Sequence, residues 1–198
     1  FDTAPQYGDG KSEEALGWLL AEVPEAPFVS TKVRIDITSS ESLVSQVDRS
    51  VTESLGRLKR DQVDLLQIHS LIMPEASGRT ISADHVLRVG GTADAMEKLR
   101  DQGMTRFLGL TALGNNKATI EAIKSGRFDA AQIYYNLINP SSAWDSVMSS
   151  WSSYDGSGIM AACRDQDMAV MAIRIFAASY LATPKRTGRE SILTANTE

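Results

Sequence analysis

Short apolar runs alternate with amphipathic segments along most of this chain, and this alternation limits the folds open to it more than any other feature. Six runs rich in apolar or β-branched residues are predicted to be strands: 1–4 (the end of one), 28–33, 63–69, 106–111, 130–135 and 169–176. Segments with helical periodicity separate them. Strands that alternate with helices form a parallel sheet covered by helices, so the fold class is α/β.

The predicted helices carry apolar side chains spaced by three and four residues. The first begins at Ser12, which we expect to cap it, and ends before Pro24. The second is opened by a capping box from Thr38 to Glu41 and runs to Leu58. Three more helices are predicted at 92–102, 116–125 and 158–166, with loops at 70–91 and 137–157.

Two parallel architectures fit this order of elements. An open doubly wound sheet normally carries a glycine-rich phosphate turn, and Gly8-Asp9-Gly10 lacks the third glycine of that motif. A (β/α)8 TIM barrel places its chemistry at the carboxyl ends of several strands. Polar residues do occur there in this sequence: Asp2, Lys32, His69, Thr111 and Gln132. We therefore predict a single, incomplete barrel domain over residues 1–198, with six to seven of its eight strands.

The composition excludes several classes of protein. The chain has 198 residues and a formal net charge of -5, whereas a nucleic-acid-binding domain would carry a basic stripe. Its densest basic cluster, Arg57, Lys59 and Arg60, is interpreted as the exposed end of a helix. Since no apolar run approaches the roughly 20 residues needed to cross a bilayer, no membrane partner is expected. A lone cysteine, Cys163, excludes an internal disulfide framework and favours a reducing, cytoplasmic location.

Four residues at or just after predicted strand ends suggest chemistry: Asp2, Tyr7, Lys32 and His69. In a parallel barrel their side chains converge on one mouth. A lysine buried there needs a carboxylate such as Asp2, because an unpaired charge is costly to desolvate. At about 4 Å and an effective dielectric of ~20, Lys32 would stabilise the Tyr7 phenolate by roughly 4 kcal/mol, which lowers the tyrosine pKa from ~10 toward neutrality. Such a tyrosine is a usable general acid.

Each of these residues also has a purely structural interpretation. Asp2 can cap a turn, Tyr7 can be a turn aromatic, Lys32 an ordinary strand-end lysine, and His69 a core histidine. Singly these interpretations are favoured, whereas four convergent positions together favour function. His85 has no partner in the pattern and is interpreted as structural. Two histidines and one cysteine without ligand spacing predict no metal site, and no Gly-x-Ser-x-Gly elbow is present.

The amino-terminal segment resembles the Asp-Thr-Ala-x-x-Tyr-Gly-x-Gly-x-Ser-Glu signature of the aldo-keto reductases. It reads Phe1-Asp2-Thr3-Ala4-Pro5-Gln6-Tyr7-Gly8-Asp9-Gly10-Lys11-Ser12-Glu13. The resemblance continues in order through Ser30-Thr31-Lys32, Asp64-Leu65-Leu66-Gln67-Ile68-His69, Gly109-Leu110-Thr111 and Gln132-Ile133-Tyr134-Tyr135-Asn136. It extends to residue 181.

This resemblance implies NAD(P)H-dependent reduction of an aldehyde or ketone, or the reverse oxidation of an alcohol or sugar. Tyr7 would be the general acid, with its pKa lowered by Lys32, which Asp2 holds in place. His69 would bind and orient the carbonyl of a small-molecule substrate. NADP(H) is expected rather than NAD(H), without a metal, and the nicotinamide carboxamide would be held by Thr111 and Gln132.

The sequence also departs from the family pattern. Thr111-Ala112 stands where Ser-Asn is usual, so one carboxamide contact is lost or replaced. Ile173 occupies the place of a stacking aromatic residue. Arg174 falls where a small hydroxyl residue is common, and it either reaches the cofactor phosphates or forms a salt bridge at the barrel rim. In the long loop, Trp144, Trp151 and Tyr154 either form an aromatic wall for the substrate or merely pack over the barrel.

By the same resemblance the chain begins at the second barrel strand and lacks the carboxy-terminal segment that binds the adenosine end of the cofactor. We expect either a fragment of a larger protein or a homo-oligomer in which partner chains close the barrel. Three functions therefore stay open at this point. The chain is a reductase, an inactive fragment of one, or a non-catalytic, cofactor-binding regulatory subunit similar to some potassium-channel β subunits.

Overall fold

The computed structural model describes residues 1–177 and 179–185 and contains one fully parallel sheet. Its strands follow one another in chain order: β1 (Ser30–Val33), β2 (Val63–Ile68), β3 (Thr105–Ala112), β4 (Ala130–Tyr134) and β5 (Ala169–Ile173). All four neighbouring pairs are parallel, with Lys32 opposite Gln67 and Thr111 opposite Gln132. An order without exchanged strands is what a barrel requires, and the predicted α/β class is confirmed.

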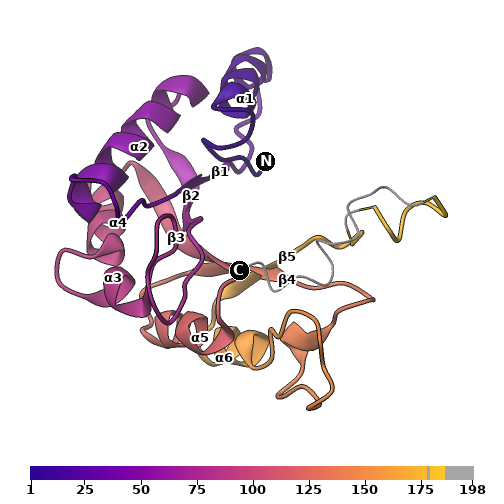
Figure 1. Cartoon of the computed structure of the whole chain (residues 1–198). Helices are drawn as coiled ribbons and strands as arrows, with labels where there is room; N and C mark the ends of the chain where they lie inside the picture. The colour runs from indigo at the N-terminus through magenta and orange to yellow at the C-terminus, as the bar shows by residue number, and fades with distance from the viewer. Residues whose placement is uncertain (178, 186–198) are drawn as a thin grey trace.

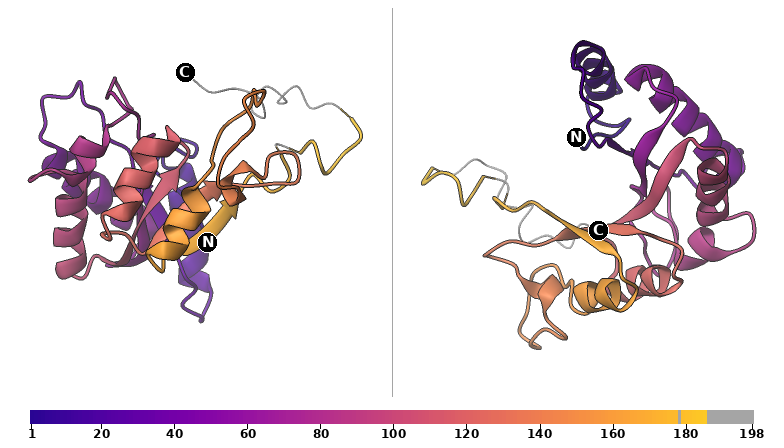
Figure 2. Two further views of the ribbon diagram at one scale, coloured as in Figure 1. Left: turned by 90° about the horizontal axis from the view of Figure 1, so that it is seen from below. Right: turned by 180° about the vertical axis from the view of Figure 1, so that it is seen from behind.

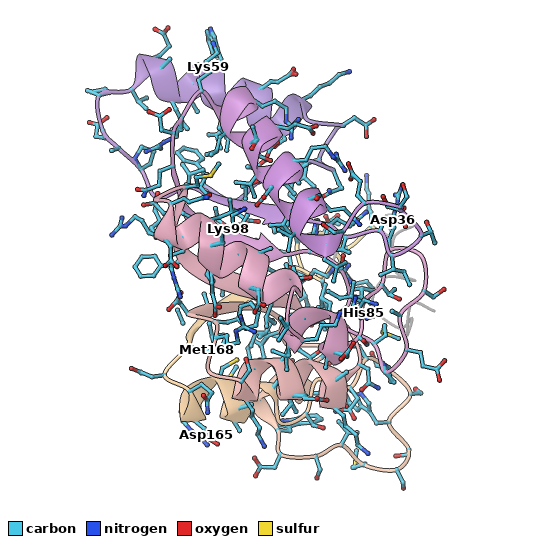
Figure 3. All side chains as sticks on the ribbon, turned by 90° about the vertical axis from the view of Figure 1, so that its left-hand side faces the viewer. Asp36, Lys59, His85, Lys98, Asp165 and Met168 are labelled. Atoms are coloured by element: carbon cyan, nitrogen blue, oxygen red, sulfur yellow. The ribbon has the colours of Figure 1, made fainter. Side chains whose placement is uncertain are left out.

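The sheet curves into an arc, and the helices cover its convex side (Figures 1 and 2). The helical elements are α1 (Lys11–Glu22), α2 (Leu43–Leu58), α3 (Ala83–Leu87), α4 (Thr92–Asp101), α5 (Asn116–Lys124), η1 (Ser141–Ala143) and α6 (Ile159–Asp165). Figure 3 views this helical layer. Two labelled residues lie at one edge of this layer: Asp36, which follows β1, and His85. The opposite edge carries four residues that precede strands: Lys59, Lys98, Asp165 and Met168.

Of the six predicted strands, the one at residues 1–4 is reduced to a single bridge. Asp2 pairs in parallel with Ser30, and backbone bonds of 2.9 Å and 2.8 Å join Thr3 N to Ser30 O and Ser30 N to Phe1 O. This short pairing places Asp2 alongside the strand that carries Lys32. The amino-terminal segment thereby adds one bridged residue pair to the edge of the sheet beside β1.

Alternation along the strands separates the core from the site. The convex face of the sheet carries Leu66, Ile68, Leu108, Leu110 and Ile133, all fully buried against the helices. From the helices, Val47, Val51, Met96, Leu99 and Ile123 complete this core. Because successive side chains of a strand point to opposite faces, the residues between these apolar ones face the concave side. Those include the polar residues of the predicted site.

Two predicted helix starts were wrong. Helix α2 is capped by Ser42, whose hydroxyl accepts a bond of 3.1 Å from Ser45 N. Thr38 instead donates its amide and its hydroxyl to Asp36 in a local turn, so it is unavailable as a cap. Helix α1 begins after Gly10, at φ 89°, and Ser12 lies inside it with its hydroxyl 2.9 Å from that of Thr3.

Short helices also occur where loops were predicted. Helix α3 lies within 70–91, and its first turn is held by Ser82, whose hydroxyl accepts from His85 N and lies 2.7 Å from His85 Nδ1. The 3-10 turn η1 lies within 137–157. Both were missed because five and three residues are too few to establish a helical period. No helix in the described part of the chain has the length and apolar character that crossing a membrane requires.

Candidate active site

The four predicted chemical residues lie together at the carboxyl end of the sheet. Lys32 comes from β1, Asp2 from the bridge beside it, Tyr7 from the turn that precedes α1, and His69 directly follows β2. The ammonium of Lys32 lies 2.7 Å from Asp2 Oδ2 and donates to Tyr7 OH at 3.3 Å. The rings of Tyr7 and His69 meet edge to face at 5.8 Å between centroids.

Lys32 is 1% exposed and fully paired. An ammonium has three donors, and here they reach Asp2 Oδ2, the Thr3 carbonyl at 2.8 Å and the Tyr7 hydroxyl. A buried cation is tolerated only with such partners, because its desolvation costs several kcal/mol. The lysine is thus fixed in place beside the tyrosine oxygen.

Tyr7 is 40% exposed, and its hydroxyl oxygen accepts from the Lys32 ammonium. Since that oxygen acts as acceptor toward Lys32, its own proton is free to be donated elsewhere. The ammonium also lies 4.8 Å from the centre of the tyrosine ring. A cation at this position stabilises the phenolate that remains after the proton leaves.

His69 is held as a neutral imidazole. Burial lowers its pKa to about 4, and the nearby positive charges of Lys32 and Arg34 act in the same direction, while Asp2 opposes them. Its Nδ1 lies 2.9 Å from Oε1 of Gln6, and its Nε2 makes no hydrogen bond to a described residue. Gln6 was quoted within the signature but given no role.

Two glutamines hold Asp2 from its other side. Gln132 Nε2 donates to Asp2 Oδ1 at 2.8 Å, and Gln67 Nε2 lies 3.4 Å from the same oxygen and 2.7 Å from Ser30 Oγ. Gln132 was predicted as a nicotinamide ligand, and this structure shows it bound to the carboxylate. Gln67 was missed, although its position two residues before His69 places both on one face of β2.

A buried ion pair anchors the turn that carries Tyr7. Glu13 is 0% exposed; it accepts from Thr31 Oγ1 at 2.5 Å and from Arg57 Nε at 2.7 Å. It therefore links α1 to β1 and to α2. The prediction that Arg57 is an exposed helix end was wrong for this residue, which is 23% exposed. The Arg57 side chain also packs against Gly10. The backbone φ of Gly10 is 89°, a conformation that would be strained in a residue with a side chain.

A cavity of about 320 Å³ opens beside His69. Its lining includes Thr111 and Tyr134, which are 3% and 2% exposed. Their hydroxyl oxygens are buried and have no hydrogen-bond partner among the described residues. Buried polar atoms are normally paired, so these two are suited to meet a polar ligand. This supports the prediction that Thr111 contacts a bound molecule.

Of the remaining predicted positions, Arg174 and Tyr154 line this cavity. Arg174 lines it, with its guanidinium 5.7 Å from the ring centre of Tyr134. It forms no salt bridge with a described residue, which disfavours the rim ion pair. Of the three aromatic residues in the long loop, Tyr154 lines the cavity, whereas Trp144 and Trp151 pack edge to face on each other. No three potential metal-ligating side chains gather in the described part.

Comparison with known proteins identifies the family. The profile of the Aldo/keto reductase family matches residues 1–194. The chain is 36% identical to L-galactose dehydrogenase from Arabidopsis thaliana over 116 residues, which cover 57% of this chain and 34% of that relative. It is 27% identical to D-threo-aldose 1-dehydrogenase from Pseudomonas sp over 218 residues, which cover 96% of this chain and 59% of the relative.

Solved structures agree in fold. The glycerol dehydrogenase from Gluconobacter oxydans matches with a TM-score of 0.67 and 22% identity over 96% of this chain and 55% of that one. An aldo-keto reductase from Klebsiella pneumoniae in complex with NADPH matches with a TM-score of 0.65 and 22% identity, over 90% of this chain and 53% of that one. The chain thus spans about half the length of these structures, and its sheet is part of a (β/α)8 barrel. The chain belongs to the aldo/keto reductase family.

Proposed function

We propose that this chain carries the proton-transfer site of an NAD(P)H-dependent reductase of small aldehydes or ketones, which also runs in reverse as an alcohol dehydrogenase. The observation that carries this proposal is the contact of the buried Lys32 ammonium with both Asp2 and the Tyr7 hydroxyl. A structural lysine needs a carboxylate, whereas a second contact to a partly exposed tyrosine hydroxyl has a use in acid catalysis.

In this proposal Tyr7 donates its proton to the carbonyl oxygen as that oxygen becomes an alcohol. Lys32 stays protonated and stabilises the resulting phenolate, and Asp2 keeps the ammonium in place. His69, neutral at pH 7 because its pKa is about 4, offers Nε2 to the carbonyl oxygen. In this structure Gln6 presents Oε1 to Nδ1, so the single ring proton lies on Nδ1. Nε2 donates to the carbonyl oxygen once the Gln6 amide turns over and presents its NH2 group to Nδ1, which moves the ring proton to Nε2.

A nicotinamide cofactor, when bound, supplies the hydride for this reaction. The unpartnered Thr111 hydroxyl fits a polar group such as its carboxamide, and Gln132 lies beside it as its register partner on β4. We assign Arg174 to a cofactor phosphate, because it lines the cavity and forms no salt bridge with a described residue. NADP(H) is proposed rather than NAD(H), since similar structures from Klebsiella pneumoniae and Bombyx mori are complexes with NADPH and NADP.

The proposed setting is the cytoplasm, with a small carbonyl compound as substrate and neither nucleic acid nor membrane as partner. The test is a titration of the chain with NADPH and NADH followed by tryptophan fluorescence, and then a panel of aldehydes with NADPH oxidation as readout. Saturable NADPH binding with turnover is expected. Tight NADPH binding with no turnover on any aldehyde would contradict a reductase and favour a cofactor-binding regulatory subunit.

A further inference from the structure

One wall of the cavity beside His69 carries two arginines. Arg34 lies two residues beyond Lys32, so it continues the same face of β1 one step further toward the mouth. Arg79 lies in the turn from Ser77 to Thr80, which is closed by the Thr80 N to Ser77 O bond of 2.9 Å. Both side chains line the cavity.

A backbone hydrogen bond holds the segments of these two arginines together. Ile37 N donates to Gly78 O at 2.9 Å, so the chain that follows β1 is tied to the turn that follows β2. This bond, rather than a single connecting loop, keeps the segments of Arg34 and Arg79 next to each other. They form one positively charged wall, defined here as the Arg34–Arg79 wall.

The charge of this wall is not neutralised. Neither arginine forms a salt bridge or a side-chain hydrogen bond with a described residue, although most other described arginines do: Arg49, Arg57, Arg88, Arg100, Arg106, Arg127 and Arg164. The carboxylate of Asp36 interacts electrostatically with Arg79, but only weakly. Hydrogen bonds from Thr38 lower the pKa of Asp36 more than Arg79 does. That carboxylate is thus already engaged by Thr38 at 2.9 Å and 2.5 Å.

The Arg34–Arg79 wall lines the same cavity as His69. Arg34 is close enough to His69 to help lower the pKa of its imidazole. The cavity is also lined by Tyr134, whose buried hydroxyl has no described partner. A ligand that satisfies the wall and this hydroxyl therefore reaches His69 from the same cavity.

We propose that the Arg34–Arg79 wall is a subsite for an anionic group, and that the carbonyl substrate accordingly carries a carboxylate or a phosphate. This inference rests on the proposed function and specifies its substrate class. A guanidinium presents paired N–H donors that match both oxyanions. Arg174, on the β5 side of the cavity, is left to the cofactor phosphates, so the two anions are bound by different residues.

Paired aldehydes of closely matched shape test the subsite. We would compare 4-carboxybenzaldehyde with neutral 4-formylbenzamide in the unmodified chain, in Arg34→Gln, in Arg79→Gln and in the double variant, with NADPH at low salt. Each single substitution is expected to lower kcat/KM for the carboxylate about tenfold and that for the neutral aldehyde less than twofold. Arg164→Gln, on the distant helix α6 and 79% exposed, is the matched control and should change neither.

Direct binding separates this inference from the catalytic one. Benzoate, compared with benzamide, is titrated into the chain while the His69 ring signals are followed by NMR, with His85 as reference. A saturable shift that needs benzoate and disappears in the double variant supports the subsite even when no aldehyde is reduced, in which case only the proposed function fails. Turnover with an unchanged carboxylate preference in the double variant overturns the subsite alone.

The cofactor is the competing source of an anion. NADPH affinity is therefore measured for the same variants and is expected to stay within twofold of the unmodified chain. An NADPH Kd weakened about tenfold in Arg34→Gln or Arg79→Gln, with no change in carboxylate preference, would assign these arginines to a cofactor phosphate and overturn the inference.

Discussion

The ammonium of Lys32 lies 2.7 Å from Oδ2 of Asp2, and the 29 residues between them include the whole of helix α1. Lys32 is 1% exposed, whereas the Asp2 side chain is 42% exposed. The carboxylate therefore stands between a buried cation and solvent. It neutralises Lys32, while another donor of the same ammonium reaches the Tyr7 hydroxyl at 3.3 Å.

Replacement of Asp2 by Asn should reveal the free-energy cost of burying the Lys32 ammonium without a counter-ion. The variant leaves the Lys32 charge without its counter-ion, and because Asp2 is partly exposed we expect a loss of about 2 kcal/mol in the free energy of unfolding. Urea denaturation of the chain measures this loss. Asp145→Asn, in the exposed loop, is the control and should stay within about 0.5 kcal/mol of the unmodified chain. Equal stabilities for Asp2→Asn and the control would show that Lys32 does not need this carboxylate.

The Glu13–Arg57 pair makes a second prediction about stability. Glu13→Gln removes the charge that faces Arg57, and since Glu13 is fully buried we expect a loss of about 3 kcal/mol. The neighbouring Glu14 is exposed, so Glu14→Gln is a closely matched control expected to change stability by less than about 0.5 kcal/mol. Similar values for the two variants would remove the anchoring role of Glu13.

His69 should titrate far below an ordinary histidine. Its pKa is about 4 and unfolding returns it toward 6.5, so the unfolded chain binds more protons between these pH values. The stability that this group contributes is therefore fully present above pH 6.5 and is lost as the pH falls toward 4. NMR titration of the ring signals measures the pKa directly, and Arg34→Gln is expected to raise it. A His69 pKa of 6 or more would contradict the neutral imidazole assigned at pH 7.

Much of the site could be predicted from the sequence because it depends on strand ends. In parallel strands the carboxyl ends share one edge, so Asp2, Lys32 and His69 had to converge once the strands were recognised. The contacts of Gln67 and Glu13 could not be predicted in the same way. Neither a strand period nor a helix period says which polar side chain meets another across elements. Arg57 illustrates this limit, because its helix-end position indicates exposure and only the packing of α1 on α2 covers it.

Gln67 is expected to act by positioning Asp2. Gln67→Leu removes the amide that reaches Asp2 and Ser30, so turnover should fall about tenfold while NADPH affinity is retained. Steady-state kinetics with parallel NADPH titrations measures both. Gln102→Leu, at the exposed end of α4, serves as the comparison. A Gln67→Leu enzyme with full activity would limit this residue to packing.

Tyr7→Phe tests the central assignment most directly. The variant keeps the ring and removes only the hydroxyl that Lys32 contacts, so single-turnover reduction of an aldehyde by bound NADPH should slow by 10² or more while NADPH binds as before. Tyr180→Phe, with a half-exposed side chain beyond β5, is the matched control and should react at the unmodified rate. A Tyr7→Phe rate equal to that of the control would contradict the assignment of Tyr7 as the proton donor.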